Sequence, residues 1–504
     1  MLRTQMSTYG TQQNAISVSS STSECNLSQL QHLDLPDFLL SLSAELASDE
    51  SPPECRRLAG IILKNSVDGR YSADGDLLIN QWINLDQLIK LKIKELLLIT
   101  LGSSVPEAWR ASSKVIAKVA YIDIPRREWP DLIGKLLSNM AQQGAYPPPL
   151  KQATLEALGY VFEEIVQLDP DEVNAVLNAV IQAMYQAELS SEVRLAATKA
   201  LQIVLKHANF ANDGCRNLIM SAIRDTAESD EAAEMIKQEA FGCLVVIASK
   251  YYAMLEPYME TMLSLTTEAL KGGVESGALQ CMEFWITMCE KVIELREQNK
   301  PFAHAISTAD CHFIEKPLSS IVPILLQTLL NQEGDDNAQS ISMSGMTCLG
   351  LIARTVGDAI VPLAMQFVEG NIKASDWKSR KAATSALGVI LEGPSIEKLA
   401  PLVRLLFDRM DDPNMVVRCA AVCTLRRVFE LFHSPACANR IFIDANLPRI
   451  VAVLAKRSKD APEVSKEACG AIYFLAKGYG SISSELSPFL SNIFRCSLFY
   501  FSTC

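Results

Sequence analysis

The stretch Arg194-Leu195-Ala196-Ala197-Thr198-Lys199-Ala200-Leu201 contains the pattern that decides the fold, roughly R-x-A-A-x-x-A-L. Clear copies occupy residues 380–387 and 418–425. Weaker copies end at Leu63, Ala117, Leu158, Leu244, Met282, Leu349 and Ile472. Most successive copies lie about forty residues apart. A repeat of this length predicts stacked pairs of α-helices, that is, an α-solenoid of about ten helical pairs.

Each repeat is expected to contain two helices, and the second helix contains the pattern. In the best example, residues 173–184 are expected to form an amphipathic first helix. The second helix is expected to open at Ser190-Ser191-Glu192, with a side-chain cap and a carboxylate in its first turn. The alanines of the pattern let neighbouring helices approach closely. The arginine that opens the pattern is expected to stay at the surface and to bond the preceding turn. No segment keeps the alternation of a half-buried strand, so the expected fold class is all-α.

Composition limits the classes of function. The chain has 504 residues, and a solenoid can reach this length because each repeat contacts only its neighbours. The net charge of −12 argues against nucleic acid as the main partner and leaves basic proteins plausible. The 14 cysteines lack paired spacing, which predicts reduced core residues in a cytosolic or nuclear protein. No secretory signal and no apolar run of about 20 residues is visible, so we expect a soluble chain without membrane insertion.

Two steps between copies are longer than the rest. The step from Leu63 to Ala117 contains a polar insertion at 67–77, which is expected to be a loop. The step from Met282 to Leu349 contains two expected loops, at 296–311 and 333–337. Insertions in repeat proteins gather on one face and often bind partners, whereas tolerated surface padding is the simpler explanation of either loop alone.

Both ends of the chain differ from the repeats. Residues 1–24 are polar and are expected to be disordered. Residues 479–504 are expected to form a partial repeat and an atypical tail. Solenoids usually end in polar capping repeats, so the chain is expected to be truncated at both ends. Between these ends we expect an N-terminal region at 25–102 and regular repeats at 103–478.

No arrangement of residues predicts catalysis, a metal site or a cofactor. The five histidines are dispersed, at His32, His207, His304, His312 and His433. They share no metal-ligand spacing with cysteines or acids, and the adjacency of Cys311 and His312 is interpreted as incidental. The sequence Ser342-Met343-Ser344-Gly345 resembles a nucleophile elbow only faintly and lies within a repeat helix. We therefore expect that the protein is not an enzyme.

Apolar residues on successive first helices are candidates for recognition. Leu177 and Ile181 lie four residues apart on one helix, and Leu218-Ile219 open the same face of the next. Tyr258 lies near the start of a later first helix. Apolar stripes at helical spacing usually face the core, which is the simpler interpretation. The functional alternative is a set of shallow apolar slots between outer helices, each taking one aromatic side chain. Trp285 and Trp377 have the same two interpretations.

Several segments resemble the importin-β (karyopherin-β) family of nuclear transport receptors, in a plant-like form. The resemblance rests on residues 57–66 (RLAGIILKNS), 192–201 (EVRLAATKAL), 278–285, 376–377 with 390–394, and 469–473. It covers about residues 30–490, and residues 25–102 match the N-terminal region of the family. It implies a superhelix of HEAT repeats, which is an armadillo-like fold. It also implies that the protein carries other proteins into the nucleus. It also implies three kinds of partner: Phe-Gly nucleoporins, cargo or an adaptor of the importin-α type, and the GTPase Ran.

The resemblance assigns binding residues as well. Those implied for nucleoporin binding are Leu177, Ile181, Leu218 and Ile219 in a first slot and Tyr258 in a second. Those implied for an acidic loop that contacts Ran and the adaptor are Glu333, Asp335 and Asp336. Gln339 and Cys423 stand where the family has tryptophans, so the resemblance supports nucleoporin binding more directly than binding of Ran or the adaptor.

The expected location follows from the same resemblance: cytoplasm, nucleus and nuclear pore. An alternative function is a HEAT-repeat scaffold of a phosphatase-like or other signalling assembly. Such scaffolds have more uniform repeats, and the two long steps between pattern copies argue against one here.

Overall fold

The structure is a computed structural model of residues 1–504. It describes residues 34–69, 75–141, 148–165, 168–185, 188, 190–229, 232–272, 275–298, 312–330, 336–395, 398, 405–432 and 440–478. Every regular element in these ranges is a helix, which confirms the predicted all-α fold class. Two compact units divide the chain, residues 1–247 and residues 248–504, and each is described by itself.

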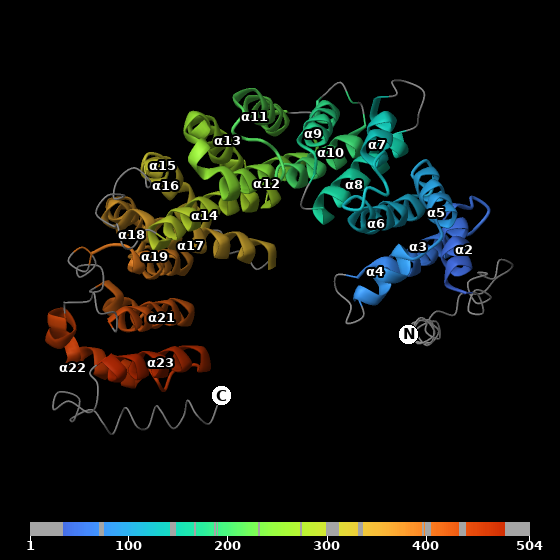
Figure 1. Cartoon of the computed structure of the whole chain (residues 1–504). Coiled ribbons are helices and arrows are strands. Elements are labelled where there is room, and N and C mark those ends of the chain that lie inside the picture. Colours follow the sequence, from blue (N-terminus) through green and yellow to red (C-terminus); the bar gives the residue numbers. More distant parts are fainter. Residues whose placement is uncertain are drawn as a thin grey trace. The chain divides into compact units, whose positions relative to one another are not determined.

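The first unit is a series of antiparallel helical pairs (Figure 1). Its helices are α2 (Leu35–Ala47), α3 (Pro53–Val67), α4 (Gly75–Ile83), α5 (Gln87–Thr100), α6 (Pro106–Asp123), α7 (Leu132–Ala141), α8 (Pro148–Glu164), α9 (Pro170–Met184), α10 (Ser191–Val204), α11 (Asp213–Glu228) and the greater part of α12 (Glu234–Tyr251). Helices α3, α6, α8 and α10 pack side by side as the second layer, and α7, α9 and α11 do so in the first. The quoted pattern lies in α10, as predicted for a second-layer helix.

The second unit repeats this arrangement. Its elements are η3 (Tyr252–Met254), η4 (Glu256–Tyr258), α13 (Met259–Lys271), α14 (Glu275–Gln298), α15 (His312–Glu315), α16 (Leu318–Thr328), α17 (Asp336–Val356), η6 (Gly357–Ile360), α18 (Val361–Asn371), α19 (Trp377–Val389), η7 (Ile390–Glu392), α21 (Met415–Phe432), α22 (Arg440–Arg457) and α23 (Pro462–Gly478). Helices α14, α17, α19, α21 and α23 contact one another in that order as the second layer.

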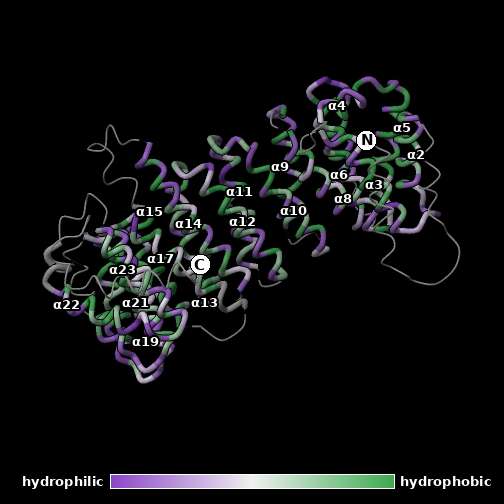
Figure 2. The backbone as a smooth tube through the Cα atoms, turned by 90° about the horizontal axis from the view of Figure 1, so that it is seen from below, coloured by the Kyte–Doolittle hydropathy of each residue, from purple (hydrophilic) through white to green (hydrophobic). Residues whose placement is uncertain are grey.

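Small residues bring the second-layer helices together. Ala59, Ala200 and Ala382 of three pattern copies are at most 2% exposed. Gly60 lies so close to α6 that an added Cβ would stand 2.5 Å from the Cβ of Ala111, so any larger residue would force α3 and α6 apart. Apolar and polar segments alternate along the helices, as the tube in Figure 2 shows. The core therefore runs between the two layers and between successive pairs.

The arginines that open the pattern do not stay at the surface, so that prediction is wrong. Arg194 is only 7% exposed. Arg380 donates to the carbonyls of Ala374 and Ser375 in the preceding turn, as predicted, but its guanidinium also holds both carboxylate oxygens of Asp412 at 2.7 and 2.9 Å. The turn that contains Asp412 leads into α21, the next second-layer helix. The arginine side chain is thus drawn inward by an acid of the following pair.

The same connection recurs one pair later. Arg418 donates to the carbonyls of Asp412 and Pro413 and holds both oxygens of Asp460 at 2.8 Å. Hydrogen bonds from Arg418 lower the pKa of Asp460 well below its ordinary value, against the opposing effect of burial. Such bidentate charge-assisted pairs are geometrically specific. We name the two pairs Arg380–Asp412 and Arg418–Asp460 the arginine–aspartate ladder.

Part of the first predicted loop is helical. Residues 70–74 lie outside the described residues, but α4 begins at Gly75 and includes Leu77. Trp82 of α4 is 1% exposed, and its indole N–H donates to a carboxylate oxygen of Asp123 at 2.9 Å. Lys94 of α5 pairs with the same carboxylate at 2.6 Å. The insertion adds a helix because this tryptophan gains both a core position and a hydrogen-bond partner.

The second long step also differs from its prediction. Arg296 belongs to α14, which continues to Gln298, and it donates to the carbonyl of Thr355 at 2.8 Å. Asp336 and Asn337 belong to α17, so the predicted loop at 333–337 is shorter at that end. The remaining residues, 299–311 and 331–335, lie outside the described residues.

Among the residues that the structure describes, one run, residues 341–371, is long and apolar enough by composition to cross a membrane, and 44% of its most apolar window is buried. The run comprises most of α17, then η6 and α18, and it passes through Gly357 at a φ of 60°. An α-helical residue has a φ near −60°, so the α-helix is interrupted there. Because α17 packs on α14 and α18 packs on α19, the run consists of packed helices that belong to two successive pairs of the stack.

Candidate functional site

The first candidate site is a cavity between α9 and α11, the first-layer helices of two successive pairs. Local sequence fixes where both helices begin. Pro170 opens α9 behind Asp169, whose carboxylate accepts from the N–H of Asp171. Asn212 caps α11 by accepting from the N–H of Cys215 at 2.9 Å. The two helix starts therefore lie near each other and leave a hollow of about 350 Å³ between them.

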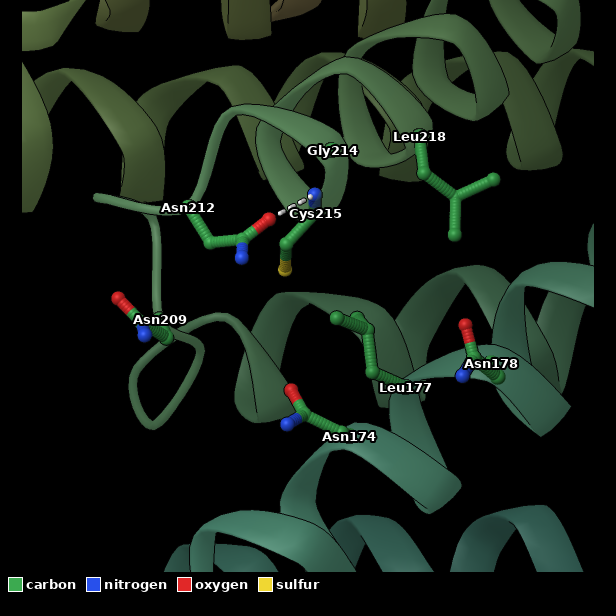
Figure 3. A pocket seen from close by; sticks show the side chains of 8 residues that line it. All are labelled: Asn174, Leu177, Asn178, Asn209, Asn212, Gly214, Cys215 and Leu218. Atoms are coloured by element: carbon green, nitrogen blue, oxygen red, sulfur yellow. Dashed lines mark hydrogen bonds between the residues drawn. The ribbon is translucent and has the colours of Figure 1, made fainter.

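Leucines and asparagines line this cavity (Figure 3). The lining residues, which define what we name the asparagine-rimmed cavity, are Asn174, Leu177, Asn178, Asn209, Asn212, Gly214, Cys215 and Leu218. Leu177 of α9 is 2% exposed, and Leu218 of α11 is partly exposed. Asn174 and Asn178 stand on either side of Leu177 in Figure 3. The volume of this cavity lies at the lower end of the size range of small-ligand sites.

The structure brings two of the predicted slot residues together and not the other two. Leu177 and Leu218 line one cavity, although they belong to different repeats. Ile181 and Ile219 are 1% and 0% exposed and do not line it. Their side chains offer no surface for direct contact in this structure, so their role in binding stays a prediction.

Cys215 is the one lining residue of this cavity with a titratable side chain. Partial burial raises the pKa of its thiol. The remaining lining residues are neutral amides, two leucines and a glycine. The cavity therefore presents an apolar floor and an uncharged polar rim at neutral pH.

A second cavity of about 380 Å³ lies in the other unit, between the start of α13 and the α15–α16 segment. Its lining residues, which define the charge-rimmed cavity, are Glu256, Pro257, Met259, Glu260, Leu263, Phe313, Lys316 and Pro317. Tyr258 ends η4 between two of them and is partly exposed, but it does not line the cavity. Phe313 and Tyr252 make an edge-to-face contact, with ring centroids 5.4 Å apart. The predicted Tyr258 thus lies beside a cavity whose aromatic wall is Phe313.

Sequence reasoning did not identify Phe313. It follows residues 299–311, where the repeat pattern has no register, so nothing placed it opposite α13. The prolines provide the signal that could have located the cavity. Pro257 and Pro317 stand at the starts of η4 and α16, and paired helix starts on adjacent first-layer helices mark the same kind of hollow as in the first unit.

The remaining predicted positions are the three acidic-loop residues and Cys423. Glu333 and Asp335 lie outside the described residues, and Asp336 opens α17 with a side chain that is not described. Cys423 lies on α21, partly exposed, with the pKa of its thiol raised by burial and by the charge of Glu467. Within the ranges given above, no three histidine, cysteine or acidic side chains come close enough to hold a metal ion.

The two tryptophans with alternative interpretations differ in burial. Trp285 is 0% exposed, and its indole N–H donates to the hydroxyl of Thr266 at 3.2 Å, so it is a core residue. Trp377 opens α19 and is partly exposed.

Comparison with known proteins adds three findings. The family model described as "Importin-beta N-terminal domain" matches residues 23–103. Importin subunit beta-1 of Arabidopsis thaliana is 43% identical over 491 residues, which cover 94% of this chain and 56% of that protein. Importin subunit beta-1 of Schizosaccharomyces pombe is 34% identical over 93% of this chain and 55% of that protein. The chain thus spans about half the length of the curated relatives that it matches.

Solved structures of importin beta and Kap95 also resemble this chain. A crystal structure of importin beta matches 94% of this chain and 56% of its own, with a TM-score of 0.82 and 31% identity. A complex of Kap95 with Nup1 matches 92% of this chain and 54% of its own, with a TM-score of 0.80 and 28% identity. Kap95p bound to RanGDP matches 92% of this chain and 54% of its own, with a TM-score of 0.78 and 28% identity.

Proposed function

The chain belongs to the importin-β family, and on this premise we propose that it is a nuclear transport receptor that binds Phe-Gly repeats of nucleoporins through the asparagine-rimmed cavity. The observation that carries the proposal is that Leu177 and Leu218, from successive first-layer helices, line one cavity with an apolar floor. The structure of Kap95 with Nup1 supports a nucleoporin as the partner. In this proposal the protein acts by binding alone and moves between cytoplasm and nucleus.

A single inserted phenylalanine suits transient binding. Burying one phenylalanine side chain is worth about 1.5–3 kcal/mol, and association costs several kcal/mol of lost translational and rotational freedom. One slot is therefore weak alone. Two slots on one chain raise the effective concentration of a second repeat from the same nucleoporin. The charge-rimmed cavity, beside Tyr258 and with Phe313 in its wall, is the second slot of this proposal.

Ran and cargo complete the proposal. The complex of Kap95p with RanGDP supports Ran as a partner, and the acidic positions Glu333, Asp335 and Asp336 are its proposed contacts. In this proposal, binding of Ran changes the affinity of the chain for cargo, which binds either directly or through an importin-α-type adaptor. Linkage then requires that cargo changes the affinity for Ran by the same factor.

Retention on immobilised Phe-Gly repeats tests the nucleoporin proposal. Leu218→Ala is the cleaner variant because Leu218 is partly exposed, whereas Leu177 is buried and Leu177→Ala costs about 2–5 kcal/mol of stability. Circular dichroism and thermal melts check that both variants fold. Asn80→Ala, an exposed position of α4, is the matched control. We expect strong retention of the parent and the control, and weaker retention of both leucine variants, because the second slot still binds. Absence of retention, or equal retention of all four proteins, would refute the proposal.

A further inference from the structure

The rim of the asparagine-rimmed cavity is unusual for this chain. Charged residues make up 21% of the sequence, yet none of the eight lining residues is charged. Four of the eight are asparagines, Asn174, Asn178, Asn209 and Asn212. The charge-rimmed cavity, of similar volume, has three charged residues in its lining. The uncharged rim is therefore a property of this cavity and does not follow from the helical packing that both cavities share.

The amides of the rim are available to a ligand. Asn174, Asn178, Asn209 and Asn212 are all exposed. Within the ranges that the structure describes, the side-chain amides of Asn174, Asn178 and Asn209 make no hydrogen bond. The side-chain oxygen Oδ1 of Asn212 accepts from the backbone N–H of Cys215, which leaves the side-chain NH₂ group of Asn212 to donate to a ligand.

The rim has two sides. Asn174 and Asn178 are one helical turn apart on α9 and flank Leu177, as Figure 3 shows. Asn209 and Asn212 lie in the segment that leads into α11. An aromatic side chain that entered between Leu177 and Leu218 would place its own backbone across this rim.

We propose that the four asparagines bind the peptide backbone on both sides of the inserted aromatic residue, so that the cavity selects an extended, uncharged segment. This inference rests on the proposed function, because it concerns what surrounds the phenylalanine in the same cavity. A primary amide both donates and accepts, so it matches the N–H and C=O of an extended chain. A charged residue beside the phenylalanine would lose hydration and find no opposite charge in the rim. The fitting partner has glycine, serine, threonine or asparagine as neighbours of its aromatic residue.

Synthetic peptides with one Phe-Gly pair between serines and glycines test the inference on the full chain. Binding is followed by isothermal titration or by fluorescence anisotropy, in the Leu263→Asp background so that only this cavity is measured. One peptide carries N-methyl groups at the residues that flank the phenylalanine, which removes backbone donors. A control peptide carries N-methyl groups near its ends. The protein variants are Asn174→Ala/Asn178→Ala and the exposed control Asn80→Ala.

We expect the double asparagine variant to bind the parent peptide about three- to tenfold more weakly, which is the range for one or two lost hydrogen bonds. The flanking N-methyl peptide should lose a similar factor with the parent protein and much less with the double variant. Peptides with aspartate or lysine beside the phenylalanine should both bind more weakly than the neutral peptide. Equal affinity of the neutral, charged and N-methylated peptides would overturn the inference.

Failure of the inference and failure of the proposed function give different results. Leu218→Asp separates them, because it fills the apolar floor with a carboxylate. If the parent peptide does not bind, or binds Leu218→Asp equally well, the proposed function is wrong. If binding requires Leu218 but ignores the asparagines and the N-methyl groups, only the backbone role of the rim is wrong.

Discussion

The asparagine-rimmed cavity and the charge-rimmed cavity have nearly the same volume, about 350 and 380 Å³, but the rim of the first is uncharged and the rim of the second is charged. Each lies where neighbouring first-layer segments begin, and each has an apolar wall, Leu177 with Leu218 in one and Leu263 with Phe313 in the other. The packing of successive repeats thus produces the cavity, and the residues at the helix starts determine whether its rim is charged. The first cavity offers neutral amides, and the second offers Glu256, Glu260 and Lys316.

The largest expected effect comes from closing one cavity at a time. Leu218→Asp should weaken binding of a single Phe-Gly peptide to the first cavity by more than about tenfold, because a carboxylate in the apolar floor must lose hydration when the ring enters. Leu263→Asp should do the same to the second cavity. Methyl NMR of the protein, with peptide titrated in, reports the two sites separately.

Each variant is the control for the other in that experiment. The comparison of the two cavities fails if Leu218→Asp also abolishes the shifts around Leu263, or if neither substitution changes any shift. Both leucines are partly exposed, so the substitutions should leave the melting temperature nearly unchanged.

A smaller effect is expected from charge beside the phenylalanine. A lysine-flanked peptide should prefer the charge-rimmed cavity, because Glu256 and Glu260 outnumber Lys316 there. In the Leu218→Asp background, Glu256→Gln/Glu260→Gln should weaken this peptide by about two- to fivefold, the range for exposed ion pairs. The preference should shrink between about 50 and 300 mM salt. A neutral peptide is the control, and equal loss for both peptides would show that the glutamates do not act through charge.

The smallest expected effect is that of pH on the asparagine-rimmed cavity. Burial raises the pKa of the Cys215 thiol, so the neutral form persists to higher pH than in an ordinary cysteine and the rim keeps its charge of zero. In the Leu263→Asp background, the dissociation constant of a neutral Phe-Gly peptide should change by less than about twofold between pH 6 and pH 8. Cys215→Ser should behave in the same way. A steep change that disappears in Cys215→Ser would show that the thiol ionises in this range.

The fold could be predicted from the sequence because its signal is repeated. The alanine-rich pattern recurs in residues that are buried for the same reason in every pair, such as Ala200 and Ala382. The position of the arginines could not be predicted in this way. Arg380 is drawn inward by Asp412, 32 residues further along the chain, and no local pattern announces that pairing. Helix α4 was missed because Trp82 depends on Asp123, 41 residues away.

The site was predictable in part. Leu177 and Leu218 could be found because they lie on the same face of successive helices. The asparagines could not, since Asn174 and Asn178 look like ordinary solvent-facing residues until α11 is placed beside them. The wall of the second cavity depends on Phe313, which follows an insertion that breaks the repeat count. A repeat pattern predicts the residues that recur in every repeat, and the rim residues of the two cavities differ from one repeat to another.

The arginine–aspartate ladder has a consequence for how such a chain can change in length during evolution. Each acid is supplied by the pair that follows its arginine, 32 residues away for Arg380 and 42 for Arg418. Removing a whole pair would present Arg380 with the acid of the next one. Removing half a pair would leave a charge that is largely inaccessible to water without a counterion, which is costly. Gain or loss of a whole pair is therefore expected to cost less stability than gain or loss of half a pair.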